Sequence, residues 1–236
     1  MPFLSGFMGL EPRRAAGTSL ATILPIVLTG AVGHLIASPH GVNWGILSLF
    51  LPFCIAGTLA AAPCIRNFAG DKLRVAFGVF LLLVSLKLLG FLPLHDLWEI
   101  ILPAGQPAVG TAAFGIVTGF VSSLLGVGSG LIMVPFFVVG LHMPMPGAVT
   151  ASLVCMVPLT LTGALVHGKM KLADPFAVRR LAPSAFVGAI VGTILWMNVP
   201  VPALRILFGV FALSMGVKQI IQGLRARSTK QRSLQA

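Results

Sequence analysis

A glycine-rich segment in the second half of the chain carries the clearest potential for chemistry. Residues 115–137 read GIVTGFVSSLLGVGSGLIMVPFF, and within them Gly126, Gly128 and Gly130 surround Ser129. Such a run breaks a helix and exposes backbone N–H groups, and the positive end of the following helix favours an anion there. A kink that serves only packing is the alternative, because glycine is ordinary in membrane helices.

Four hydroxyl side chains recur at matching positions close to the starts of two expected helices. They are Thr18 and Ser19 in the first half, with Thr150 and Ser152 in the second. Each one alone is explained as an N-cap that satisfies a free backbone N–H group. Their recurrence in both halves favours the second interpretation, in which the hydroxyls help to hold the oxygens of a bound anion.

Histidine and proline also recur at equivalent positions. His34 and His167 end the same helix in each half, where a side chain with a pKa near 6.5 can pass protons or simply hydrogen-bond to a loop. Pro25 and Pro158 lie in the middle of these helices, and each is expected to kink its helix. Pro135, after the glycine run, is a third expected kink.

These matches belong to an internal repeat. LTGAVGH at 28–34 returns as LTGALVH at 161–167, and LRVAFGVFLL at 73–82 returns as LRILFGVFAL at 204–213. The offsets from 28 to 161 and from 73 to 204 are nearly equal, so one short change in loop length explains the difference. Two related hydrophobic halves are a common plan for secondary transporters, with the site where the halves meet.

The composition places the repeat in a membrane. Apolar residues make up 57% of the chain and charged residues 9%, with a mean hydropathy of +1.01. A soluble domain carries about 25% charged residues, so a soluble protein is excluded. The expected fold is all-α, a polytopic membrane helix bundle embedded in the lipid bilayer.

The net charge of +11 does not indicate a nucleic-acid partner. The basic residues are scattered over short loops and the C-terminal end without aromatic stacking residues, which is typical of charges that orient membrane helices. Cys54, Cys64 and Cys155 lack metal-site spacing, so neither a metal nor another cofactor is predicted.

Six membrane helices are expected, together with one longer apolar stretch at 107–141 that the glycine run and Pro135 interrupt. The six lie at 17–38, 44–64, 73–92, 147–168, 176–198 and 204–223. The interrupted stretch is too long for one straight helix, so it is predicted to be a helix followed by a re-entrant half-helix, or a tight hairpin.

Loop charges predict how these helices cross the membrane. Arg225, Arg227, Lys230 and Arg232 place the C-terminus in the cytoplasm, and Arg14 marks the same side near the other end. Both ends agree only if 107–141 begins and ends outside, which makes the two repeats inverted. The predicted organisation is a first repeat at 1–93, an outer loop at 94–106, a second repeat at 107–223 and a basic cytoplasmic tail at 224–236.

The glycine-rich break with its proline, the TASL helix start at 150–153 and the His at the far end resemble the sulfite-exporter family TauE/SafE. GLEPRRAAGTSL at 9–20, followed by GAVGH at 30–34, is similar to the first-half pattern of that family. The resemblance runs from Pro2 to about Gly223. It implies a polytopic permease of the inner (plasma) membrane that moves small anions, notably sulfite and organosulfonates. Homo-oligomerisation is left open.

One departure from the pattern leaves alternatives. Met1-Pro2 aligns with Val134-Pro135, so the first half has no counterpart of 107–133. A start placed too far downstream and a shortened, non-transporting membrane subunit are both compatible with this. An intramembrane hydrolase with Ser129 as nucleophile and His167 as base is the least favoured class, because GVGSG does not match G-x-S-x-G. The chain is therefore expected to be a transporter and not an enzyme.

Overall fold

The computed structural model describes residues 12–37, 42–65, 71–91, 107–126 and 129–235, and every regular element in these ranges is helical. This confirms the expected all-α class. The elements, in chain order, are α2 (Pro12–Ala37), α3 (Trp44–Ile65), α4 (Asp71–Leu88), α6 (Pro107–Leu125), α7 (Gly130–Pro135), the π-helical turn η1 (Phe136–Gly140), α8 (Met145–Lys169), α9 (Pro175–Met197) and α10 (Val201–Gln235).

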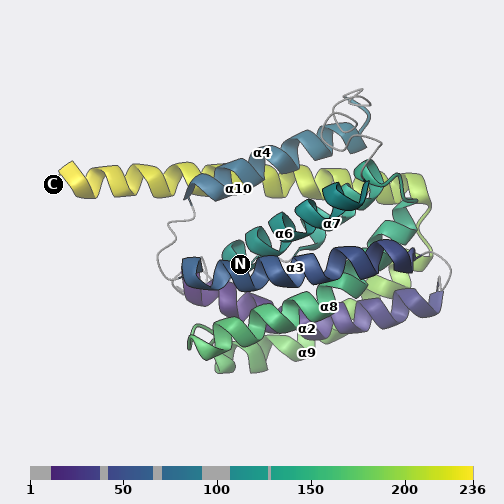
Figure 1. The fold of residues 1–236 in the computed structure, drawn as a ribbon, viewed down its shortest axis with the longest axis horizontal. Helices are drawn as coiled ribbons and strands as arrows, with labels where there is room; N and C mark the ends of the chain where they lie inside the picture. The colour runs from purple at the N-terminus through teal and green to yellow at the C-terminus, as the bar shows by residue number, and fades with distance from the viewer. Residues whose placement is uncertain (1–11, 38–41, 66–70, 92–106, 127–128, 236) are drawn as a thin grey trace.

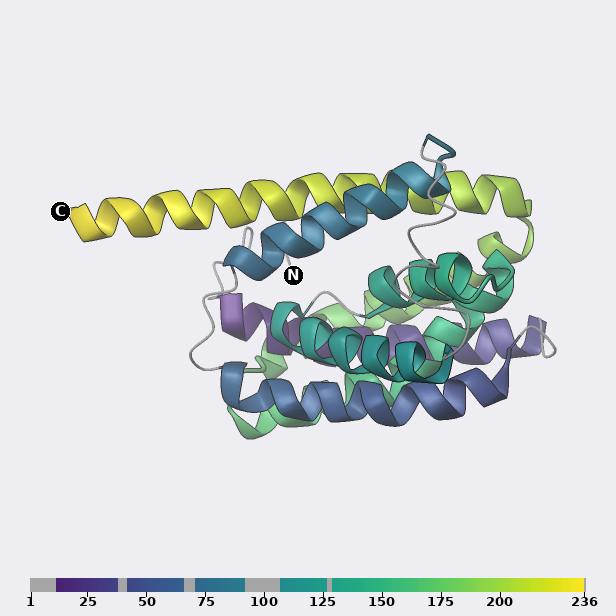
Figure 2. The same cartoon turned by 45° about the horizontal axis from the view of Figure 1, so that its top comes forward.

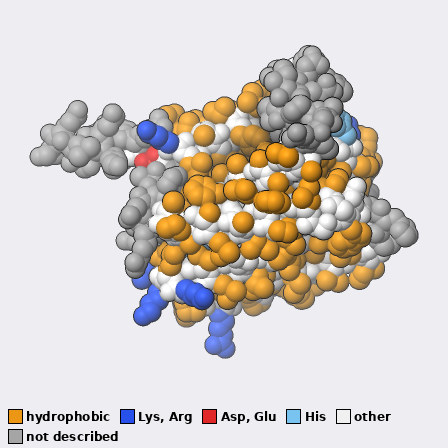
Figure 3. All heavy atoms as spheres, in the orientation of Figure 1, with side chains coloured by type: hydrophobic (Ala, Val, Ile, Leu, Met, Phe, Trp, Pro, Cys, Tyr) orange, Lys and Arg blue, Asp and Glu red, His pale blue; other side chains and the backbone are white. Residues whose placement is uncertain are grey.

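Six helices in the described part of the chain are long and apolar enough to cross a membrane: α2, α3, α6, α8, α9 and α10. The face of the bundle drawn in Figure 3 is largely apolar, as its orange side chains show. Large apolar side chains such as Ile194 and Leu195 on α9 are exposed. In water such a surface would be very unfavourable, so this is a multi-pass membrane protein.

Three expected helix ends are wrong, and the first is the start of the predicted helix 17–38, which begins as α2 at Pro12. The predicted helix 73–92 ends as α4 at Leu88, because Gly90 adopts a positive φ of 82° that a continuing helix does not allow. The predicted helix 204–223 continues as α10 to Gln235, so the basic tail extends the last helix and projects from the bundle in Figure 1. The α4 segment also carries four charges, including Lys87, and is not among the six apolar helices.

Helices α3 and α6 pack closely through glycines. A Cβ atom added to Gly115 would lie 3.0 Å from the carbonyl oxygen of Phe50, and one added to Gly119 would collide with the backbone of Cys54. On α3, a Cβ at Gly57 would collide with the backbone of Ile116. The small-xxx-small spacing of Gly115 and Gly119 therefore allows the close helix contact that it predicts.

Helices α2 and α8, which carry the repeated sequence, lie against each other in opposite directions. Gly17 near the start of α2 faces His167 near the end of α8, and Gly30 faces Leu153. Such an antiparallel contact is the one that an inverted repeat requires, although the inversion across a membrane remains a prediction. The other repeated pair, α4 and α10, also lie side by side (Figures 1 and 2).

The chain brings many of its basic loops to one end of the bundle. The backbone N–H of Asp174, just before α9, donates to Thr18 Oγ1 near the start of α2. Gly223 of α10 packs beside Asp71 at the start of α4. On the face drawn in Figure 3, Lys and Arg side chains gather at this end. That clustering supports the predicted cytoplasmic side, which remains a prediction.

Candidate functional site

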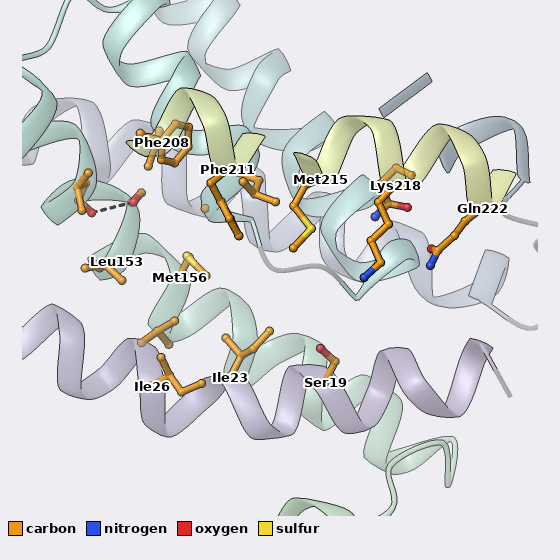
Figure 4. Close-up of a pocket in the computed structure, with 17 residues that line it drawn as sticks. Ser19, Ile23, Ile26, Leu153, Met156, Phe208, Phe211, Met215, Lys218 and Gln222 are labelled. Atoms are coloured by element: carbon orange, nitrogen blue, oxygen red, sulfur yellow. Dashed lines mark hydrogen bonds between the residues drawn. The ribbon is translucent and has the colours of Figure 1, made fainter. Parts of the chain in front are cut away.

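A cavity of about 600 Å³ lies between α2, α7, α8 and α10 (Figure 4). The predicted site residues Ser19, Ser152 and Gly130 all line it. The two serines are repeat counterparts, because they are offset in the sequence by the same number of positions as 28 and 161. The fold thus brings one hydroxyl from each half and the start of the half-helix to a single hollow.

The glycine break separates a full helix from a short one, as expected. Gly126 follows α6 with a φ of +58°, and an added Cβ there would lie 2.5 Å from the Cα of Ala16 on α2. Gly126 therefore serves a left-handed turn and a close contact, and it does not line the cavity. Gly128 lies outside the described residues.

The short helix α7 begins deep within the bundle. An added Cβ on Gly130 would lie 3.0 Å from the sulfur of Met156, which is close to the middle of α8. After Pro135 the chain continues as the π-helical turn η1, so the backbone pattern changes at the proline that was expected to kink it. A helix interrupted at mid-depth is typical of transporter sites.

The mid-helix prolines lie inside α2 and α8, both of which continue through them. The hydroxyl of Thr29 donates to the carbonyl oxygen of Pro25 at 2.8 Å, and that of Thr162 donates to Pro158 at the same distance. These two bonds are related by the repeat offset. A kink at Pro25 or Pro158 remains a prediction.

The capping interpretation of the four hydroxyls is wrong. Helix α2 begins at Pro12 and α8 at Met145, so Thr18 and Thr150 lie a turn or more inside their helices. Thr150 donates to the carbonyl oxygen of Pro146, and Ser152 donates to that of Val149 at 2.7 Å. Prolines near both starts allow the helices to begin earlier than the hydroxyls suggested.

The four hydroxyls also differ in what they face. Ser19 and Ser152 line the cavity, whereas Thr18 and Thr150 are buried and do not. Thr18 donates to the carbonyl oxygen of Arg14 at 2.8 Å and accepts the N–H of Asp174 at 3.0 Å. That pair of bonds ties α2 to the start of α9, so Thr18 has a structural task.

The two histidines are buried and lie away from the cavity lining. The ring of His34 packs on Trp196 of α9 with 4.0 Å between ring centroids. His167 Nδ1 lies 2.9 Å from the carbonyl oxygen of Gly163. A proton relay through either residue therefore stays a prediction without a contact to the cavity.

Ser129 is fully buried, and its hydroxyl has no hydrogen-bond partner among the described residues. His167 is thus not paired with it, and the nucleophile–base contact that a serine hydrolase needs is not formed. Ser129 precedes α7 without capping it through its side chain.

Three polar residues of α10 were not predicted as part of the site. Lys218, Gln219 and Gln222 line the cavity together with Ser19. The repeat contained a signal for the first of them, because Lys218 is the counterpart of Lys87 at the same offset that relates 204 to 73. Comparing the last turns of 73–92 and 204–223 would have drawn attention to this lysine.

Most of the cavity wall is apolar and comes from α2, α8 and α10. In the described part of the chain no group of three or more His, Cys, Asp or Glu side chains is placed to hold a metal ion. The cavity therefore offers hydroxyls, amides, one ammonium group and apolar surface. These groups suit binding and passage of a solute.

Comparison with known proteins agrees with this architecture. The sequence model of the family described as "Sulfite exporter TauE/SafE" matches residues 1–88 and 111–236. The chain belongs to the TauE/SafE sulfite exporter family. The match includes both copies of the repeat and the residues described around the cavity.

Two bacterial relatives are named as transporters. The chain is 24% identical over 233 residues to the "Probable membrane transporter protein YunE" of Bacillus subtilis (strain 168), covering 92% of this chain and 84% of the relative. It is 24% identical over 198 residues to a "Probable membrane transporter protein" of Xylella fastidiosa (strain 9a5c), covering 82% and 74%. No solved structure matches the chain.

Proposed function

We propose that this membrane transporter is a secondary permease that exports small anions, such as sulfite or organosulfonates, across the plasma membrane. The observation that carries this proposal is the shared cavity, whose lining includes Ser19 and Ser152 from repeat-related helices together with Gly130. Family membership supports an anion as the transported solute.

The same arrangement supports transport by alternating access. The cavity lies at the contact between α2 of the first half and α7, α8 and α10 of the second. Rocking one half against the other would open such a cavity to each side in turn. We further propose that the C-terminus is cytoplasmic, because the basic ends of the helices gather where α10 leaves the bundle.

The test is efflux of radiolabelled sulfite and sulfoacetate from proteoliposomes that contain the purified protein. Ser19→Ala and Ser152→Ala are expected to raise the KM about threefold to tenfold, since each removes one hydrogen-bonding group from the wall. Ser214→Ala is the matched control, because this exposed serine of α10 donates to the carbonyl oxygen of Phe211 and lies outside the cavity lining.

The outcomes separate the parts of the proposal. If Ser19→Ala and Ser152→Ala keep the KM of the unmodified protein, as the control Ser214→Ala is expected to do, the site lies elsewhere. Absence of efflux of both solutes from the unmodified protein would reject these substrates.

A further inference from the structure

The polar groups of the cavity are not distributed evenly. Lys218 and Gln222 reach from α10 toward Ser19 on α2 at one end (Figure 4). The remainder of the wall near α10 is formed by Phe208, Phe211 and Met215, and large apolar side chains of α2 and α8 face them. The cavity thus has a polar end and a largely apolar body, and the hydroxyl of Ser152, next to Leu153 in the lining, already donates to the carbonyl oxygen of Val149.

Lys218 provides the charge of the polar end. It is the single charged side chain among the described residues that line the cavity, and this lining includes no carboxylate. No ion-pair partner of Lys218 is found in the described part of the chain, and the residue is exposed. An ammonium group beside an apolar cavity attracts an anion, because no opposing charge in the wall compensates it.

The apolar body of the cavity indicates which kind of chemical group is attached to the anionic group of the ligand. A bare oxyanion that moved beyond Lys218 would lose water against Phe211, Met215 and their neighbours and gain few hydrogen bonds in return. A hydrocarbon portion would instead gain from burial on the same surface. A volume of about 600 Å³ lies in the range of sites for small organic ligands.

We propose that the cavity binds an amphiphilic organic anion, a sulfonate or carboxylate with an apolar chain, whose charged group lies on Lys218 and whose chain extends along Phe211 and Phe208. This inference rests on the proposed anion transport and names the substrate class of that same cavity. Gln222 and Ser19 supply hydrogen bonds to the charged group, and Met156 lines the wall beside the chain.

Two sources supply such a molecule. One is a free organic anion from the aqueous phase, and the other is an anionic phospholipid from the surrounding bilayer. Both present a negative head on an apolar body. The binding experiment therefore keeps the lipid composition constant while the organic anion is varied.

The binding experiment uses the full chain in nanodiscs of zwitterionic phosphatidylcholine. The affinities of methanesulfonate, butanesulfonate and hexanesulfonate are measured by competition with a radiolabelled alkanesulfonate. The affinity is expected to rise by roughly fourfold for each methylene that enters the apolar body. Hexan-1-ol and hexylammonium, of equal chain length, are expected to compete weakly, because neither presents an anion to Lys218.

Variants test the charge separately from the chain. Lys218→Gln is expected to weaken hexanesulfonate binding by about tenfold, and Lys218→Arg to retain it. Arg205→Gln is the matched control: it removes one exposed positive charge from the same helix, outside the cavity lining, and should leave binding unchanged. Thermal unfolding without ligand checks that each variant is folded.

A second set of nanodiscs containing phosphatidylglycerol distinguishes the two sources. Competition by this lipid in the unmodified protein, reduced in Lys218→Gln, supports the proposal with a lipid as the ligand. Chain-dependent binding that phosphatidylglycerol leaves unchanged supports it with a free organic anion.

Failure of this inference is distinct from failure of the proposed function. Efflux of sulfite together with equal affinities for all three sulfonates would overturn the amphiphile and leave the exporter intact. Chain-dependent binding through Lys218 without efflux of any anion would support the ligand class and reject transport. Equal binding by hexan-1-ol and hexanesulfonate would overturn the role of the charge.

Discussion

Leu20 on α2 packs over Gly163 on α8, and Leu153 on α8 packs over Gly30 on α2. The two contacts are the same contact made twice, because Leu20 and Leu153 are repeat counterparts, as are Gly30 and Gly163. A two-fold relation between the helices produces such a reciprocal pair. It brings Ser19 and Ser152, the neighbours of these leucines, to the wall of one cavity.

Gly57 and Gly188 are repeat counterparts at the same offset as 73 and 204, but only Gly57 should be sensitive to replacement by alanine. A Cβ at Gly57 collides with the backbone of Ile116, whereas a Cβ at Gly188 meets nothing within 4 Å. Gly57→Ala is expected to lower the free energy of unfolding by about 1–3 kcal/mol, because the crowded helices must separate. Gly188→Ala should be neutral. Thermal unfolding in detergent measures both, and equal losses would contradict the close α3–α6 contact.

Alanine variants of Gly90 and Gly126 distinguish the cost of backbone strain from the cost of steric crowding. Both adopt a positive φ, but only Gly126 has a neighbour, Ala16, within reach of an added Cβ. Gly90→Ala is expected to cost about 1–2 kcal/mol for the left-handed conformation alone. Gly126→Ala should cost more and also displace the start of α2. Chemical denaturation of the two variants checks the order, and the reverse order would show that the break is not packed on α2.

Thr18→Val tests the structural task of this hydroxyl. The variant leaves the N–H of Asp174 without its acceptor, so stability is expected to fall by about 1–3 kcal/mol. Thr22→Val is the control, because Thr22 only donates to the carbonyl oxygen of Thr18 within the same helix. Tm and efflux are measured together. Unchanged Tm with lost efflux in Thr18→Val would instead support the predicted substrate contact.

His34→Phe tests the proton-relay hypothesis without removing the aromatic contact with Trp196. Phenylalanine keeps a ring against the indole but cannot carry a proton. Because His34 does not line the cavity, efflux and its dependence on a pH gradient should persist. His34→Ala serves as the comparison and should lower Tm by removing the ring contact. If His34→Phe loses only the dependence of efflux on the pH gradient, that result would support the proton-relay hypothesis.

Much of the fold was predictable from the sequence because membrane helices are read from apolar length. The expected span 44–64 is α3 (Trp44–Ile65), and 176–198 is α9 (Pro175–Met197). The ends of α4 and α10 were less predictable. A positive φ at Gly90 shortens one helix, and the polar residues after Gly223 extend the other without any apolar signal.

The sequence by itself determined that the protein is a helical membrane protein, that its halves are related and that a glycine run interrupts one helix. Apolar length, repetition and glycine content can be recognised in the sequence without knowing which residues come into contact in the fold. Family membership follows from the same information.

Only the tertiary structure decided which polar residues share the cavity. Ser19 faces it and the adjacent Thr18 does not, because neighbouring residues point about 100° apart on a helix. In helices that are apolar on nearly all sides, no hydrophobic stripe tells which direction is inward. Packing of α2 against α8 and α9 settled the direction, and packing of α10 against α4 and α8 brought Lys218 to the site from the far end of the chain.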